Sequence, residues 1–382
     1  MQRNIFDSDH DAFRQTVRQF LGKEVVPHIA DWEADGRVPR ELFTKTAEIG
    51  INGLQVPEEF GGGGIDSFLF NAIVIEEIGY AAATLGGLQV HLSTVLPYFF
   101  EYADTEQKSR WFPGFADGSL VSSIAMTEPG TGSDLAGMAT HAVRDGDDWI
   151  LNGAKTFITG GINADLIVVA ARTNRDVTNR RDGLSLFVVE AGMDGFLRGR
   201  NLDKLGLKAQ DTAELLFDNV RVPARNLLGE EGAAFSMLTN NLPQERLTIA
   251  VSAQATATAA LRLATDYVKD RKVFGQRVAD FQNTKFVLAD CATELEAGQA
   301  LVDRALVALD SGTLSVADAA KVKLFTTEMQ ARVIDRCLQL HGGYGFMREY
   351  PIARLYADAR VTRIFGGTSE VMKSVISRSL EL

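Results

Sequence analysis

The spacing of apolar residues changes twice along this chain, and these changes limit the folds that it can adopt. In the first 120 residues, apolar positions such as Phe13, Val17 and Phe20 recur at helical spacing. Between residues 121 and 222 the pattern changes to short runs rich in β-branched residues, separated by turns; Leu166–Arg172 and Leu184–Glu190 are examples. The first part therefore reads as helical and the second as a set of strands.

Helical spacing returns after Gly229 and continues to the end of the chain. Gly312 is expected to end one long helix, and Gly342 and Gly343 the next. Long antiparallel helices with apolar faces are typical of four-helix bundles. The sequence predicts an α+β fold: an N-terminal all-α domain (1–120), a middle antiparallel β-barrel-like domain (121–228) and a C-terminal four-helix bundle domain (229–382).

Composition excludes several classes of function. The net charge of −11 argues against nucleic acid or an anionic membrane surface as the main partner. The five histidines are scattered without ligand spacing, so no metal is expected. Cys291 and Cys337 fall within helical patterns and are expected to be buried, reduced thiols. The chain has no run of about 18 apolar residues, which argues against a membrane span, and its polar, acidic start predicts a cytoplasmic protein.

The segment Thr127–Asp134 reads Thr-Glu-Pro-Gly-Thr-Gly-Ser-Asp and follows the strand-like run Val121–Met126. Proline and two glycines exclude a regular helix here. A glycine- and hydroxyl-rich loop after a strand offers backbone N–H groups and side-chain donors to a ligand. An ordinary surface turn is the structural alternative. A second glycine-rich stretch, Gly61–Gly64, lacks the spacing of a phosphate-binding loop and is interpreted as structural.

Five segments in order resemble the acyl-CoA dehydrogenase family over the whole chain. They are Thr127–Asp134, Phe157–Gly161 (Phe-Ile-Thr-Gly-Gly), Arg271–Gly275 (Arg-Lys-Val-Phe-Gly), Gln339–Phe346 (Gln-Leu-His-Gly-Gly-Tyr-Gly-Phe) and Gly367–Glu370 (Gly-Thr-Ser-Glu). Leu205–Leu215 and Leu242–Leu247 are most similar to the long-chain branch of that family. Each segment alone is weak, but their order and spacing together carry the resemblance.

The resemblance implies FAD as cofactor and α,β-dehydrogenation of a fatty acyl-CoA, with medium to long acyl chains expected. Residues matched to the flavin and its pyrophosphate are Ala125, Met126, Thr127, Gly132, Ser133, Phe157, Ile158, Thr159, Thr368, Ser369 and Glu370. Residues matched to the FAD site of a neighbouring subunit are Arg271, Gln282, Gln339, Leu340, His341, Gly342 and Gly343, and Phe274 is also expected to bind the cofactor. The resemblance therefore also implies at least a dimer, with a homotetramer expected. An electron-transfer flavoprotein is the expected electron acceptor.

The catalytic base departs from the commonest family pattern. Many members have a glutamate at the position of Gly366, and glycine has no proton acceptor. The matching position in the isovaleryl and long-chain branches indicates Glu245, two residues after Pro243, which favours a kink or a helix start. A solvent-facing glutamate paired with Arg246 is the structural alternative. Glu370 is a rival acid, although the family pattern assigns that position to FAD.

Substrate contacts are expected from Ser133, Pro243, Gln244, Arg246, Gly366 and Gly367, with the backbone N–H of Gly366 polarising the thioester oxygen. The pocket floor is expected from the helix around Leu88–Pro97, where the small or flexible residues Gly86, Gly87, Ser93 and Thr94 in or next to it would leave depth. Three other functions stay open: action on a carrier-protein thioester, an oxidase or monooxygenase on the same fold, and a scaffold without FAD.

Overall fold

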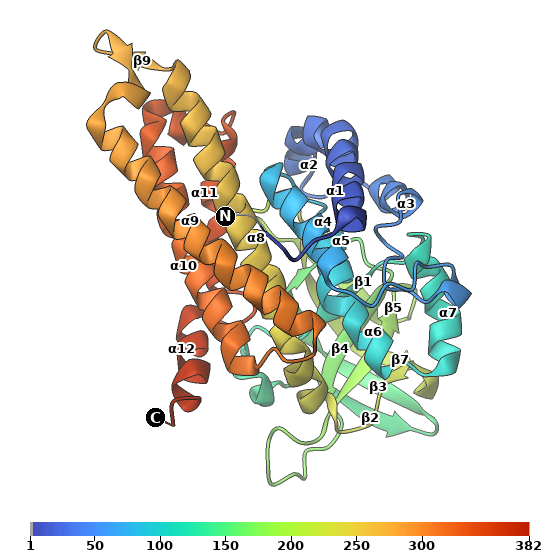
Figure 1. Cartoon of the computed structure of the whole chain (residues 1–382). Helices are drawn as coiled ribbons and strands as arrows, with labels where there is room; N and C mark the ends of the chain where they lie inside the picture. The colour runs from blue at the N-terminus through green and yellow to red at the C-terminus, as the bar shows by residue number, and fades with distance from the viewer. Residues whose placement is uncertain (1–2, 382) are drawn as a thin grey trace.

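A computed structural model describes residues 3–381, so the ends of the first and last predicted domains lie outside the described residues. The N-terminal part is helical and covers one side of a central sheet (Figure 1). Reciprocal capping by Asp7 with His10, and by Asp104 with Gln107, starts its first and last long helices. These elements are α1 Ser8–Phe20, α2 Ile29–Asp35, α3 Glu41–Glu48, α4 Leu69–Tyr80, α5 Leu88–Val90, α6 Leu96–Tyr102 and α7 Thr105–Ala116.

One turn of this domain departs from α-helical geometry. Residues His91–Val95 (η4) form a π-helical turn between α5 and α6, a feature frequently found at functional sites. A second π turn, Leu21–Val25 (η1), and the 3₁₀ turn Val26–His28 (η2) separate α1 from α2. Since Pro27 lies in the 3₁₀ turn and has no N–H, the helical pattern over this stretch gives two shorter helices.

The middle part is an eight-stranded sheet in the order β6-β7-β3-β2-β4-β5-β8, with β1 paired to β4. Its strands are β1 Ser122–Ala125, β2 His141–Asp145, β3 Asp148–Thr159, β4 Leu166–Arg172, β5 Leu184–Glu190, β6 Phe196–Asn201, β7 Thr212–Val222 and β8 Leu227–Leu228. The predicted antiparallel pairing needs one correction. β1 runs parallel to β4, and β2 meets β4 through a parallel pair, because a long connection through β2 and β3 returns the chain in the direction of β1.

Strand β4 is buried on both faces and joins two cores. Leu166, Val168 and Ala170 pack into the core shared with the N-terminal helices, whereas Ile167, Val169 and Ala171 pack into the interior of the β domain. This alternation follows from the two-residue period of a strand. It fixes the sheet firmly against the helices, which is what positions the loop after β1.

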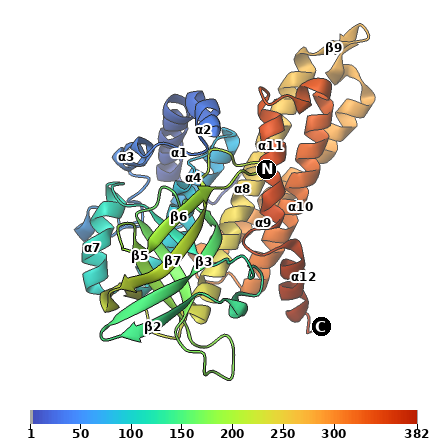
Figure 2. The same cartoon turned by 180° about the vertical axis from the view of Figure 1, so that it is seen from behind.

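The C-terminal part contains three long helices, α8 Ala234–Asp270, α9 Gln282–Asp310 and α10 Val316–Leu340. The shorter α11 Pro351–Ala359 and α12 Ser369–Arg378 pack against α10 and complete the bundle (Figure 2). A two-stranded hairpin, β9 Lys272–Val273 and β10 Gln276–Arg277, projects from one end of it (Figure 1). Cys291 and Cys337 are free cysteines buried in this bundle.

By length and composition alone, helix α8 could cross a membrane. However, 61% of the 18-residue apolar window on which this rests is buried inside the protein. Such burial is what the core helix of a bundle shows. Small residues allow its close packing: a Cβ added to Gly79 of α4 would lie 2.6 Å from the Cβ of Ala255. Helices of both helical domains therefore meet along α8. We propose domain boundaries near residues 120 and 228, between α7 and β1 and between β8 and α8.

Candidate active site

Glu245 is buried in the interior of α8, with 7% of its surface exposed. Pro243 also lies inside α8, so it does not start a helix, and the helix continues through the predicted kink position. The hydroxyl of Tyr98 on α6 donates a hydrogen bond to Oε1 of Glu245 at 2.8 Å. Burial raises the pKa of Glu245 to about 7, against the opposing effects of the Tyr98 hydroxyl and the Arg246 guanidinium. A carboxyl group with this pKa can act as a base near neutral pH.

The loop between α11 and α12 lies over the same face of α8. A Cβ on Gly366 would lie 2.4 Å from Cδ1 of Ile249, which is one helical turn after Glu245. Gly366 also has a positive φ of 61°, a conformation that favours glycine. Both the backbone conformation at residue 366 and its packing against α8 therefore favour a residue without a side chain.

Lys323 of α10 holds this loop from the bundle side. Its side chain is buried, and Nζ donates to the carbonyl of Gly367 at 2.5 Å. Burial, and then the nearby guanidinium of Arg246, lowers the pKa of Lys323 to about 8. Arg246 is itself only 4% exposed, and its Nε and Nη1 have no hydrogen-bond partner within residues 3–381. These orphan donors can bind an acceptor on a ligand.

The loop after β1 is held by a buried ion pair. Nζ of Lys155 lies 2.9 Å from Oε1 of Glu128, and this carboxylate also accepts from the backbone N–H of Ala139 and Thr140. Burial acts to raise the pKa of Glu128, but the N–H of Ala139 and the charge of Lys155 outweigh it and hold the pKa below its usual value. Beyond this anchor, added Cβ atoms at Gly130 and Gly132 would meet nothing within 4 Å. The loop thus presents open glycines on a fixed base.

Phe157 is exposed and conformationally strained beside that loop. It has a φ of 60° and is 67% exposed, at an irregularity in the pairing of β3 with β7 between Lys155 and Ile158. The N–H of Thr156 donates to the carbonyl of Thr127, which brings the two segments together. Non-glycine residues with a positive φ cluster at active sites and ligand clamps. A flat, aromatic cofactor fits this surface.

Three family models match the chain in order: acyl-CoA dehydrogenase N-terminal domain over residues 7–119, middle domain over 123–220 and C-terminal domain over 232–381. The chain belongs to the acyl-CoA dehydrogenase family.

Individual relatives agree with this assignment. The long-chain specific acyl-CoA dehydrogenase of Sus scrofa mitochondria is 47% identical over 99% of this chain and 88% of its own length. The crystal structure of an acyl-CoA dehydrogenase from Geobacillus kaustophilus superposes with a TM-score of 0.98 at 46% identity, covering all of both chains. A glutaryl-CoA dehydrogenase from Mycobacterium smegmatis, solved in complex with FADH2, has a TM-score of 0.90 and 30% identity, covering 98% and 95% of the two chains.

The chain is therefore an oxidoreductase of the acyl-CoA dehydrogenase type, and the predicted α+β architecture of three parts is confirmed. Enzymes of this family carry out flavin-dependent dehydrogenation of acyl-CoA. The strained Phe157 and the open glycines after β1 fit a flavin.

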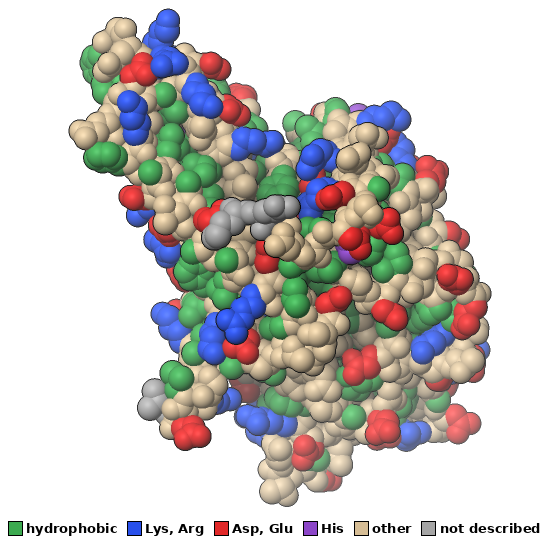
Figure 3. Space-filling view, viewed as in Figure 1, with side chains coloured by type: hydrophobic (Ala, Val, Ile, Leu, Met, Phe, Trp, Pro, Cys, Tyr) green, Lys and Arg blue, Asp and Glu red, His purple; other side chains and the backbone are tan. Residues whose placement is uncertain are grey.

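The second group of expected flavin residues gathers at the far end of the bundle. Arg271 and the segment Leu340–Gly343 line a hollow of about 490 Å³ beside the β9–β10 hairpin. The guanidinium carbon of Arg271 lies 5.5 Å from the centre of the Tyr344 ring, and Phe274 at the hairpin turn is 96% exposed. Apolar side chains are visible over this end of the surface (Figure 3). Gln282 and Gln339 are also exposed on the adjoining helices.

Within one chain, a flavin that contacted this far end as well as Phe157 and Glu245 would have to span the bundle. Glu245 and Arg271 are separated by about 39 Å along α8, at 1.5 Å per residue. Within one chain, the expected residues at the bundle end are therefore well separated from Glu245.

Some expected residues make contacts within the protein. The hydroxyl of Thr368 accepts from the N–H of Val371 and caps α12, and Ser369 donates to Glu328 at 2.6 Å. Gln244 donates to the carbonyl of Ser93 in η4 at 3.2 Å. The side chain of Glu370 is exposed at the start of α12.

The expected role of Gly86 and Gly87 in pocket depth needs correction. A Cβ on Gly86 would lie 2.7 Å from Val38, and one on Gly87 would lie 2.6 Å from the Cα of Gly160. Both positions require a residue as small as glycine because other segments pack directly against them. Close packing, and not an open pocket, therefore explains this glycine pair.

Sequence reasoning missed Tyr98, Lys323 and the Glu128–Lys155 pair. Only Glu128 lies within a segment that the sequence singled out. The position of a tyrosine or lysine along a helix or strand does not show that its side chain is buried against a charged group on a distant segment.

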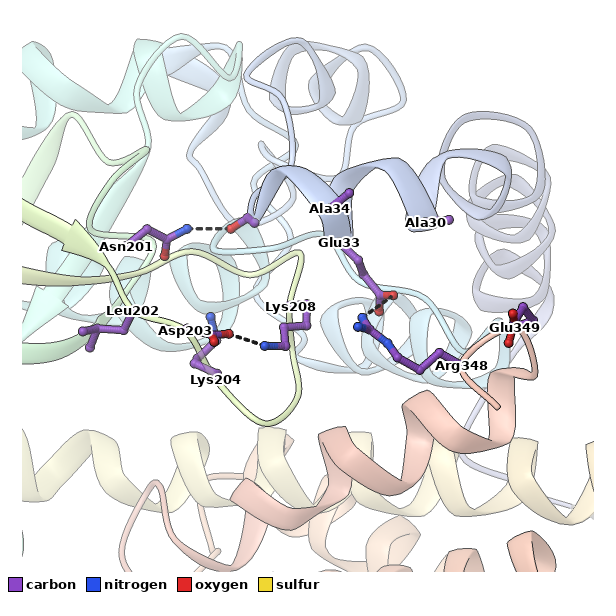
Figure 4. Close-up of a pocket in the computed structure, with 11 residues that line it drawn as sticks. Ala30, Glu33, Ala34, Asn201, Leu202, Asp203, Lys204, Lys208, Arg348 and Glu349 are labelled. Atoms are coloured by element: carbon purple, nitrogen blue, oxygen red, sulfur yellow. Dashed lines mark hydrogen bonds and ion pairs between the residues drawn. The ribbon is translucent and has the colours of Figure 1, made fainter. Parts of the chain in front are cut away.

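A larger hollow of about 720 Å³ lies outside this region, between α2, the loop after β6 and residues 348–349 (Figure 4). Four of its charged groups form pairs: Lys208 with Asp203, and Arg348 with Glu33 at 4.0 Å. It contains none of the expected catalytic or cofactor residues. Within residues 3–381, no group of three or more His, Cys, Asp or Glu side chains is arranged to hold a metal ion.

Proposed function

We propose that Glu245 removes the α-proton of a medium- to long-chain acyl-CoA thioester, giving the trans-2-enoyl-CoA. The observation that carries this proposal is the burial of Glu245 on the face of α8 covered by the Gly366 loop. The α C–H bond breaks and its proton passes to the carboxylate. The electron pair of that bond enters the new double bond. Bound FAD, held by the residues named below, would supply the acceptor for the hydride that leaves the β-carbon.

The remaining groups of the site are suited to polarise the thioester. The backbone N–H of Gly366 is proposed to donate to the thioester oxygen, where negative charge develops as the proton leaves. Arg246 brings donors without a partner in residues 3–381 close to the base, and Lys323 keeps the loop in place through Gly367. Ser133, Pro243 and Gln244 are proposed as further contacts of the acyl-CoA.

The flavin is proposed to lie between two subunits. Residues Ala125–Thr127, Gly132, Ser133 and Phe157–Thr159 of one subunit would hold the ring and pyrophosphate, with Thr368, Ser369 and Glu370. The group at the bundle end, Arg271, Phe274, Gln282 and Gln339–Gly343, would reach the FAD of a neighbour. The separation along α8 and the exposure of Phe274 support this arrangement. Arginine is also suited to the site because its guanidinium can donate two parallel hydrogen bonds to a phosphate group.

The substrate range and partners are proposed from the family. Medium to long acyl chains are favoured because a relative with 47% identity is named long-chain specific. An electron-transfer flavoprotein is the proposed electron acceptor, a homotetramer the proposed assembly and the cytoplasm the proposed location.

The test is a Glu245→Gln variant, assayed by anaerobic bleaching of the flavin with acyl-CoAs of increasing length. Removal of a general base is expected to lower the bleaching rate by about 10²–10⁴-fold. The variant should stay yellow and bind the substrate, because glutamine has nearly the same shape. Bleaching at the normal rate would refute the assignment.

Glu370→Gln tests the rival acid, which is exposed. Because Glu370 is also proposed to contact FAD, bleaching is measured per bound flavin, and the variant should keep most of that rate. Wild-type bleaching by a pantetheinyl carrier protein but not by CoA esters would instead indicate a biosynthetic enzyme. Rapid peroxide formation in air would indicate an oxidase or monooxygenase, and a colourless purified protein would indicate a scaffold.

A further inference from the structure

Tyr98 joins the N-terminal helical domain to the proposed base. Its side chain has no exposed surface, and its hydroxyl donates to Oε1 of Glu245 at 2.8 Å. The two residues lie on α6 and α8, 147 positions apart in the sequence. No hydrogen bond to the second oxygen, Oε2, is found within residues 3–381.

The local structure before α6 fixes this contact. Pro97 has no N–H to give to the carbonyl of Ser93, four residues earlier, and Nε2 of Gln244 donates to that carbonyl instead. The π-helical turn η4 therefore docks onto α8 at the residue just before Glu245. Tyr98 follows directly after Pro97, so its ring enters the protein beside the base.

We propose that Tyr98 is a positioning residue that holds Oε1 of Glu245 and leaves Oε2 to take the α-proton. This inference rests on the proposed role of Glu245 and deepens it. A hydrogen bond to one oxygen restricts rotation of the carboxylate and directs the other oxygen toward the substrate. It also stabilises the charged form of a carboxylate that burial disfavours.

Few other groups act on this pair. Arg246, next to Glu245 on α8, is a charged group that favours ionisation of the base. Arg246 in turn acts on Lys323 of α10, and Tyr102 on α6 and the side chain of Asn241 on α8 act on Tyr98. Burial, followed by the negative charge of Glu245, raises the pKa of Tyr98 well above its usual value. Tyr98 therefore keeps its proton near neutral pH and acts as a hydrogen-bond donor there.

The test is Tyr98→Phe in the FAD-loaded enzyme, with the bleaching rate measured against pH. Loss of a hydrogen bond to a charged group is expected to move the midpoint of the profile up by about one to two pH units. The rate below neutral pH should fall by about 10- to 100-fold and recover in more alkaline buffer. A midpoint equal to that of the wild type would overturn the proposal.

A second measurement does not depend on turnover. The carboxyl band of Glu245 can be followed by infrared difference spectroscopy against pH and identified by its loss in Glu245→Gln. Its titration midpoint should rise in Tyr98→Phe, and an unchanged midpoint would count against the proposal even if the variant lost its flavin. If Glu245→Gln bleaches normally while the band still moves in Tyr98→Phe, the hydrogen bond acts as inferred but the base is another group.

Tyr102→Phe is the matched control. Tyr102 lies one turn after Tyr98 on α6, with ring centres 6.4 Å apart, and within the described part of the chain its hydroxyl makes no hydrogen bond to Glu245. Removing this hydroxyl should leave both midpoints unchanged. A shift equal to that of Tyr98→Phe would show that general loss of polarity, and not the bond to Oε1, is responsible.

Discussion

At the scale of single residues, Glu245 illustrates a functional group kept at a cost in stability. The carboxyl group is buried on α8, and burial raises its pKa to about 7. Between pH 4.5 and about 7, the folded protein keeps a proton that the unfolded chain has released. The contribution of this group to folding is therefore complete below pH 4.5 and is lost as the pH rises through about 7.

Glu245→Gln should remove this loss. At low pH, Glu245 is protonated in both the folded and the unfolded wild-type chain. This titration should then make no difference between the free energies of unfolding of the variant and the wild type. The variant should gain about 3 kcal/mol relative to the wild type by pH 8, since each pH unit of difference is worth about 1.4 kcal/mol. Urea unfolding at several pH values measures the effect. An equal gain in Glu370→Gln, whose side chain is exposed, would show that the effect does not come from burial.

At the scale of elements, the loop after β1 depends on an ion pair inside the sheet. Glu128 and Lys155 are both buried, and Lys155 also donates to the carbonyl of Met126 at 3.0 Å. Strand β3 thus fixes the beginning of the loop, while its exposed glycines stay open to a ligand. Removing one partner leaves the other charge buried and uncompensated.

Lys155→Met is expected to lower the free energy of unfolding by about 3–5 kcal/mol and to weaken FAD binding. The double variant Glu128→Gln and Lys155→Met should recover much of the stability, because no buried charge remains. Urea unfolding and fluorescence titration with FAD measure the two effects. The control is Arg221→Ala, which breaks exposed pairs with Asp145 and Asp148 in the same sheet and should cost about 0–1 kcal/mol. A Lys155→Met protein as stable as this control would contradict the assigned role.

At the scale of the whole molecule, α8 sets the distance between the two groups of proposed flavin residues. Glu245 lies in the first half of α8, and Arg271 lies where α8 ends beside the β9–β10 hairpin (Figure 1). A complete flavin site would then need one group from each of two subunits. This arrangement can be tested by mixing defective chains.

Arg271→Ala should lose FAD, and Glu245→Gln should keep FAD without bleaching. Co-production of the two chains is expected to restore bleaching, because one of the two sites in a mixed dimer then receives Glu245 from one chain and Arg271 from the other. Either variant produced alone is the control and should stay inactive. Mixed oligomers, verified by two affinity tags, that show no activity would exclude a site shared in this way.

The sequence by itself determined the order of the three architectures and the residue at which the base is proposed. Helical and strand periods follow from local geometry, and the motifs follow from short segments, so both can be read along the chain. Parallel pairing of β1 with β4, the packing that requires Gly86 and Gly87, and the contacts of Tyr98, Lys155 and Lys323 were decided only by the tertiary structure. These features join segments far apart in sequence, and whether a polar side chain is exposed or buried against a charge depends on which segment lies opposite it.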